Sequence, residues 1–168
     1  MKAWLGLGAA LLLAACMERT PGTVAFSEAE AAFIKKPGTG VIAGHAFRTK
    51  ASGTVVNAAG QLVHLIPATE FSRERFKNLF GKGKYLPHRD YPRADNPDPA
   101  YVEHMRTTKA EANGRFGFEG VAPGEYIVSS QVLWGDEEAF FREGGMVYDS
   151  VTVTGQEKEP VRAILSGN

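Results

Sequence analysis

Histidine and carboxylate side chains that could bind a metal ion occur in and just after one polar segment, residues 69–100. These candidates are His88, Asp90 and His104. Imidazole and carboxylate groups are common ligands of zinc and other divalent ions, so this set supports a hypothesis of a metal-dependent enzyme. Arg89 lies between two of the ligands, and its positive charge opposes a metal ion. We therefore expect a solvated loop without a cofactor, with the metal site as the alternative.

Aromatic and basic side chains form two further groups that could contact a ligand or a partner. One group belongs to the same polar segment and the other to a loop near residue 135. The candidate contact residues are Arg73, Arg75, Tyr85, Tyr91, Trp134, Phe140 and Phe141. Aromatic rings with polar neighbours can stack on sugars or bind proteins, and the cations suit anionic polymers, lipid headgroups or acidic protein faces. The alternatives are a solvated charged face, and a Trp134 ring that closes one end of the fold.

Nucleophilic and phosphate-binding motifs are missing from the sequence. The chain has one cysteine, Cys16, and no Gly-x-Ser-x-Gly sequence that would place a nucleophilic serine. The run of residues 81–84, Gly-Lys-Gly-Lys, lacks the spacing of a phosphate-binding loop. We therefore predict a protein without catalytic residues that is not an enzyme.

The N-terminus has the pattern of a secretion signal that ends at Cys16. Lys2 precedes an apolar run over residues 3–13, and Ala14 and Ala15 precede the cysteine. The apolar run is too short for a spanning helix. Residues 13–16, Leu-Ala-Ala-Cys, resemble the bacterial lipobox, which implies removal of residues 1–15 and lipidation of Cys16. We expect a lipid-anchored protein of the cell envelope, with the periplasmic side of the outer membrane favoured because no Asp follows Cys16.

Charge and length restrict the class of protein. The 168 residues suit a single domain, and 19 basic residues balance 19 acidic residues. A chain without net charge has no general attraction for nucleic acid. We therefore expect no nucleic-acid partner, and instead an envelope protein or polysaccharide.

The elements that must position these residues are mainly strands. Residues 16–40 read as a tether with a short helix over 29–36, where Ser27 and Glu30 form a capping box. Residues 69–100 read as an insertion with a short helix over 72–80. Seven strands are predicted at residues 41–49, 61–66, 101–112, 115–119, 126–134, 146–153 and 160–165. The Asn113-Gly114 pair predicts a hairpin, and alternation places Phe116 and Phe118 in the core and His64 on the solvent face.

A longer motif follows the Asn-Gly turn and resembles a known family. Residues 107–128 combine a Thr-rich strand, Asn-Gly, Phe-Gly-Phe, then Gly-Val-Ala-Pro-Gly-Glu-Tyr and another strand. This pattern resembles the carboxypeptidase regulatory-like family, whose members have a transthyretin-like β-sandwich. Each Gly or Pro of the motif fits a turn and each aromatic residue fits a core position. The resemblance implies the fold and leaves the function open, and the insertion at residues 69–100 departs from the family pattern.

Together these patterns predict an all-β protein, a seven-stranded antiparallel transthyretin-like or immunoglobulin-like sandwich over residues 41–168. A short helix precedes it and a helix-bearing loop is inserted in it. We expect a membrane-anchored, non-catalytic binding or scaffold module of the cell envelope. The alternatives are a metal-dependent enzyme that uses the insertion, or a module that binds carbohydrate or peptidoglycan.

Overall fold

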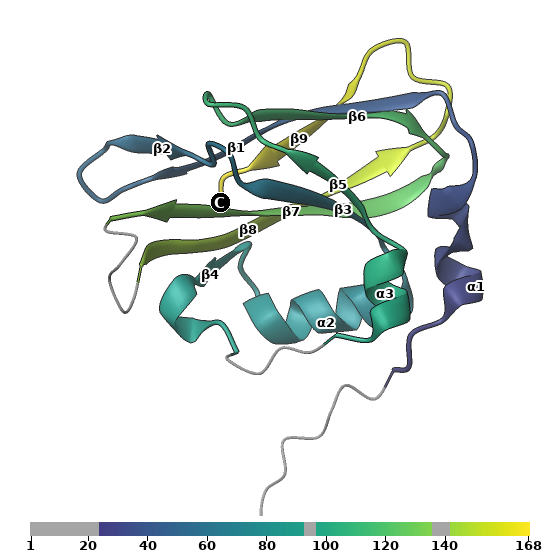
Figure 1. Cartoon of the computed structure of the whole chain (residues 1–168), viewed down its shortest axis with the longest axis horizontal. Helices are drawn as coiled ribbons and strands as arrows, with labels where there is room; N and C mark the ends of the chain where they lie inside the picture. Colours follow the sequence, from purple (N-terminus) through teal and green to yellow (C-terminus); the bar gives the residue numbers. More distant parts are fainter. Residues whose placement is uncertain (1–23, 93–96, 136–141) are drawn as a thin grey trace, which may run out of the picture.

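The protein is a β-sandwich with short helices packed beside it (Figure 1). A computed structural model describes residues 24–92, 97–135 and 142–168. Within them, two sheets pack face to face, one short helix precedes the first strand, and a helix-bearing segment is inserted between strands. This confirms the predicted all-β fold class. Cys16, Phe140 and Phe141 lie outside the described residues.

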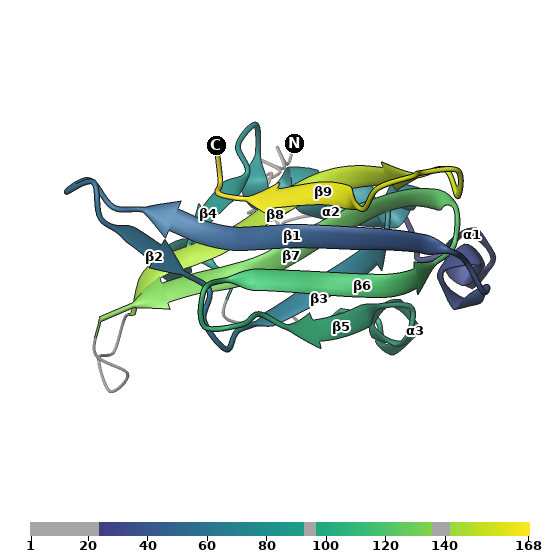
Figure 2. The same ribbon diagram turned by 90° about the horizontal axis from the view of Figure 1, so that it is seen from above.

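The smaller sheet is built around β1 (Gly40–Thr49). β9 (Val161–Leu165) pairs with β1 in parallel. β6 (Arg115–Val121) and the short β2 (Val55–Asn57) pair antiparallel with successive parts of β1. Figure 2 shows this sheet in front of the larger one.

The larger sheet has five antiparallel strands, and its outer face carries the inserted segment. In spatial order the strands are β4 (Tyr85–Pro87), β8 (Glu143–Val153), β7 (Gly124–Trp134), β3 (Leu62–Pro67) and β5 (Arg106–Lys109). The long β7–β8 pair keeps one continuous register from Gly124 opposite Val153 to Trp134 opposite Glu143. This pair gives the sheet a rigid centre.

The main core lies between the sheets and follows the alternation of side chains along each strand. Phe116 and Phe118 of β6 are buried there, as predicted, and Val63 and Leu65 of β3 face them from the other sheet. Tyr126 is fully buried, and its hydroxyl donates a hydrogen bond of 2.7 Å to the carbonyl of Ala122. Burial raises the pKa of Tyr126 to about 12, against a smaller opposite effect of Arg106.

The inserted segment covers part of the outer face of the larger sheet. Helix α2 (Glu70–Phe80) begins at Thr69, whose hydroxyl accepts a hydrogen bond of 3.2 Å from the backbone N–H of Ser72. It buries Phe76 and Phe80 against Tyr148 of β8, with ring centroids 5.0 and 4.6 Å from the tyrosine ring. The helix α3 (Pro99–Glu103) and the 3₁₀ helix η2 (His88–Asp90) complete this layer, which lies below the sheet in Figure 1. A second apolar cluster therefore joins the insertion to the sheet.

The predicted strand count and one strand assignment are wrong. Nine strands are present in the described chain. The two that were not predicted are the three-residue strands β2 and β4. The strand predicted over residues 101–112 is two elements, the end of α3 and then β5. Asp98 caps α3 and Pro99 opens it, which are helix-start signals that the strand prediction overlooked.

The turn at Asn113-Gly114 exists, but the hairpin predicted from it is wrong. Gly114 has a φ of 78°, and the N–H of Glu111 donates to the carbonyl of Arg115 at 2.8 Å. The strands on either side then separate, since β5 pairs with β3 and β6 pairs with β1. The turn therefore connects the two sheets instead of closing a hairpin within one of them.

The predicted N-terminal helix is present as α1 (Glu28–Ala31) followed by the 3₁₀ helix η1 (Ala32–Lys35). The Ser27 hydroxyl accepts a hydrogen bond of 3.3 Å from the backbone N–H of Glu30, which confirms the capping interaction. The Phe33 ring packs edge-on against Tyr126 at 5.3 Å and so closes one end of the core. Among the described helices, none is long and apolar enough to cross a membrane.

Candidate functional site

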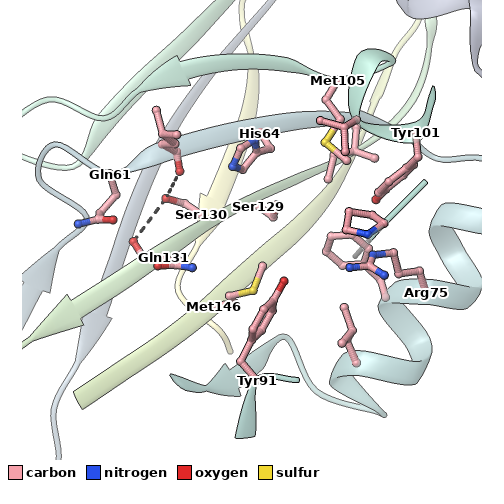
Figure 3. A pocket seen from close by; sticks show the side chains of 16 residues that line it. Gln61, His64, Arg75, Tyr91, Tyr101, Met105, Ser129, Ser130, Gln131 and Met146 are labelled. Atoms are coloured by element: carbon pink, nitrogen blue, oxygen red, sulfur yellow. Dashed lines mark hydrogen bonds between the residues drawn. The ribbon is translucent and has the colours of Figure 1, made fainter. Parts of the chain in front are cut away.

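A pocket of about 360 Å³ lies between the outer face of the larger sheet and the inserted helices (Figure 3). The sheet forms its floor, and α2, α3 and the segment after η2 form its walls. Ligand sites in proteins are concave, mainly apolar and equipped with a few polar groups, and typical volumes begin at about 300 Å³. The pocket meets these conditions at the small end of the range.

The floor consists of outward-facing side chains from three adjacent strands. His64 of β3 lies directly opposite Ser129 of β7, and Gln131 of β7 lies directly opposite Met146 of β8. Because successive residues of a strand point to opposite faces, the strands that bury Val63 and Val128 in the core present His64 and Ser129 to the pocket. The polar floor is therefore a direct result of the strand register.

His64 is held in place by the neighbouring edge strand. Its Nδ1 lies 3.3 Å from the hydroxyl of Thr107, its register partner on β5. Burial lowers the pKa of His64 below its usual value of 6.5. The imidazole is therefore mainly neutral at pH 7, with one ring nitrogen as donor and the other as acceptor.

Polar groups on the floor are available to a ligand. The hydroxyl of Ser130 is used inside the protein, since it donates a hydrogen bond of 2.9 Å to the carbonyl of Leu62. In contrast, the side-chain amides of Gln61 and Gln131 and the hydroxyl of Ser129 make no hydrogen bond within the described chain. Amide and hydroxyl groups both donate and accept hydrogen bonds, so the floor can satisfy a ligand rich in hydroxyl groups.

The described parts of the walls supply aromatic rings and the guanidinium of Arg75. Tyr101 of α3 is 3% exposed and is packed edge-on by Phe26 and Phe71, with ring centroids 5.6 and 5.0 Å away. The guanidinium of Arg75 lies 5.8 Å from the centre of the Tyr101 ring. Tyr91 is half-buried and points toward the pocket beside Met146 in Figure 3. Tyr91 therefore offers the accessible ring, while Tyr101 supports Arg75.

The residues predicted to bind metal are not brought together. His104 is 3% exposed; its Nδ1 lies 2.7 Å from the carbonyl of Ala100, and its Nε2 is 4.0 Å from the carboxylate of Glu28. Asp90 is exposed and lies 3.7 Å from the guanidinium of its neighbour Arg89. His88 occupies η2 beside β8. In the described ranges, no group of three His, Cys, Asp or Glu side chains could hold a metal ion, so the metal hypothesis is wrong for these three residues.

Only part of the predicted contact group reaches the pocket. Arg75 and Tyr91 line it, whereas Arg73 is exposed and forms an ion pair with Glu125. The Tyr85 hydroxyl donates a hydrogen bond of 2.9 Å to the carbonyl of Gly144, beneath the guanidinium of Arg48. These positions give Arg73 and Tyr85 structural interactions away from the pocket.

Trp134 lies at the far end of β7 from the N-terminal helix. Its indole N–H donates to the carboxylate of Glu143 at 2.7 Å, and its ring packs against the inter-sheet core. Lys50 lies 5.1 Å above the ring. These contacts match the alternative in which Trp134 closes one end of the sandwich.

Most of the pocket floor was not predicted from the sequence. His64 faces the pocket rather than bulk solvent, and Ser129, Gln131 and Gln61 were not recognised as site residues. One signal was available in the sequence: Ser129 and Gln131 alternate with Val128 and Val132, and His64 stands between Val63 and Leu65. Such alternation identifies an outer face. It does not reveal that the insertion covers that face.

Comparison with known proteins assigns the chain to a family. No protein-family model and no curated protein matches the chain. It is similar to a crystal structure of a candidate carbohydrate-binding protein from Pseudomonas aeruginosa, with a TM-score of 0.67 and 30% sequence identity. The match covers 84% of this chain and 97% of that chain. The chain belongs to the family of this Pseudomonas aeruginosa protein.

Proposed function

We propose that the protein is a non-catalytic carbohydrate-binding module and that the pocket between the larger sheet and the insertion binds the sugar. The observation that carries the proposal is the pair of side-chain amides of Gln61 and Gln131, together with the largely buried hydroxyl of Ser129 and the half-buried ring of Tyr91. Sugars present hydroxyl groups around the ring and apolar C–H faces above and below it. The similarity to a candidate carbohydrate-binding protein from Pseudomonas aeruginosa supports the same class of ligand.

The ligand proposed for the pocket is small. A volume of about 360 Å³ suits one or two pyranose rings rather than a long chain segment. The apolar side chains of Met105 and Met146 can contact C–H groups, and methionine adapts its shape to irregular partners. We therefore expect recognition of a terminal sugar or a short repeat.

The place of action is proposed from the sequence. The leader over residues 1–15 and the lipobox-like Cys16 support an extracytoplasmic protein held to a membrane by a lipid anchor. A module at that position meets polysaccharides of the cell envelope. Membership of the carboxypeptidase regulatory-like family stays a prediction based on residues 107–128.

Direct titration tests the binding function. The purified mature protein is titrated with a panel of monosaccharides and disaccharides by calorimetry. Gln131→Ala removes an available amide from the floor, and we expect at least about fivefold weaker binding, the value of one hydrogen bond of about 1 kcal/mol. Gln156→Ala is the matched control, because Gln156 is exposed and does not line the pocket. Equal affinity in both variants would place the sugar site elsewhere, and a panel without binding would contradict the function.

A further inference from the structure

We propose that the pocket selects acidic sugars, and that the guanidinium of Arg75 binds the carboxylate of a uronic acid. This inference rests on the proposed function, since it names the class of carbohydrate bound at the same site. A carboxylate replaces the hydroxymethyl group of a neutral hexose in a uronic acid. The two kinds of sugar therefore present nearly the same ring and differ in one charged group.

The position of Arg75 is the first argument. It is half-buried on the wall formed by α2, and Figure 3 shows its side chain extending toward the pocket beside Tyr101. Among the described lining residues, Arg75 carries a permanent charge. The other titratable groups there are His64, Tyr91 and Tyr101. Arg75 is therefore the permanently charged group that the described lining presents to a ligand.

The surroundings of Arg75 strengthen its attraction for an anion. Phe76 and Leu79 of the same helix line the pocket next to it, and the buried Tyr101 ring lies beneath its guanidinium. Apolar neighbours lower the local dielectric constant, so a charge pair in this pocket is less screened than one on the open surface. Burial also keeps His64 mainly neutral, so Arg75 is the group expected to meet the carboxylate.

The chemistry of the guanidinium fits this role. Arginine carries five N–H donors in one plane, so it can bind both oxygens of a carboxylate while it keeps other contacts. Its packing against Tyr101 restricts the orientation of the guanidinium plane. Arg73, two residues earlier on the same helix, is exposed and lies outside the pocket. The two arginines of one helix therefore provide a matched test.

The test compares two pairs of sugars at pH 7: glucuronate with glucose, and galacturonate with galactose. The mature protein is titrated with each by calorimetry. We expect at least about tenfold tighter binding of the acidic member, since a hydrogen bond to a charged group contributes more than a neutral one. Arg75→Gln should remove this preference. Arg73→Gln should keep the preference, and Arg75→Lys should retain part of it because the charge remains without the planar donor pair.

The outcomes separate the two proposals. Equal binding of acidic and neutral sugars by the wild-type protein overturns the inference and leaves carbohydrate binding intact. A preference that survives in Arg75→Gln also overturns it, because the carboxylate would then bind elsewhere. If no sugar of either pair or of the wider panel binds, the proposed function fails together with the inference. The wild-type comparison decides the question even if a variant does not fold.

Discussion

Phe76→Ala tests whether the inserted helix α2 is firmly packed on the larger sheet and so forms a stable wall of the pocket. The Phe76 side chain is 4% exposed, lies parallel to Phe80 with ring centroids 5.5 Å apart, and meets Tyr148 edge-on at 5.0 Å. Truncation removes these contacts and leaves a cavity, at a cost of about 3–5 kcal/mol. For a domain of this size the expected fall in Tm is about 6–20 °C, at roughly 2–4 °C per kcal/mol.

Urea unfolding followed by circular dichroism measures this loss in the free energy of unfolding. Asn78→Ala is the control, because Asn78 is exposed on the same helix and its replacement is expected to cost less than about 0.5 kcal/mol. The wall of the pocket should loosen in Phe76→Ala, so sugar affinity should fall as well. If Phe76→Ala were no less stable than Asn78→Ala, the packing of α2 on the sheet, and with it the account of the pocket, would be refuted.

Three further predictions concern the core, the far end of the sandwich and the anchor. Tyr126 has a folded-state pKa of about 12, above the unfolded value near 10, so its contribution to stability is complete below pH 10 and is lost as the pH rises toward 12. In Tyr126→Phe, the decrease in the free energy of unfolding between pH 9 and pH 12 should be smaller by about 2–3 kcal/mol. An equal decrease in the wild type and the variant would contradict this prediction. Trp134→Ala should lower the free energy of unfolding by about 1–3 kcal/mol, because the ring contacts the core and Glu143. Sugar affinity should stay unchanged. A loss of binding with normal stability would instead place the sugar site at Trp134. Cys16→Ser should release the protein from the membrane fraction, and mass spectrometry should find the acyl mass on Cys16 of the wild type alone; an unmodified Cys16 would refute the anchor.

The fold was largely predictable because its signals are local. The alternation that buries Phe116 and Phe118, the caps at Ser27 and Thr69 and the Gly-rich turns all act within a few residues. The Asn113-Gly114 turn shows the limit: the sequence predicts the bend correctly, but pairing of the strands after it depends on which sheet each strand joins. That choice is made by contacts distant in sequence.

The site was less predictable for the same reason. Arg75 and Tyr91 were recognised as contact residues because the insertion is unusual in composition. His64 and Ser129 lie opposite each other only after β3 pairs with β7, across more than sixty residues of chain. Their polar side chains also suit a solvent-facing surface, so the sequence alone did not separate a covered face from an open one.

The most direct test of the central claim is to map the sugar by NMR. Amide chemical shifts of the isotope-labelled mature protein are followed during titration with glucuronate. We predict the largest shifts at His64, Ser129 and Gln131 and along the pocket-facing side of α2 around Arg75, with little change at Trp134. Shifts concentrated at Trp134 and its neighbours, or absent from the pocket at saturating sugar, would contradict the account.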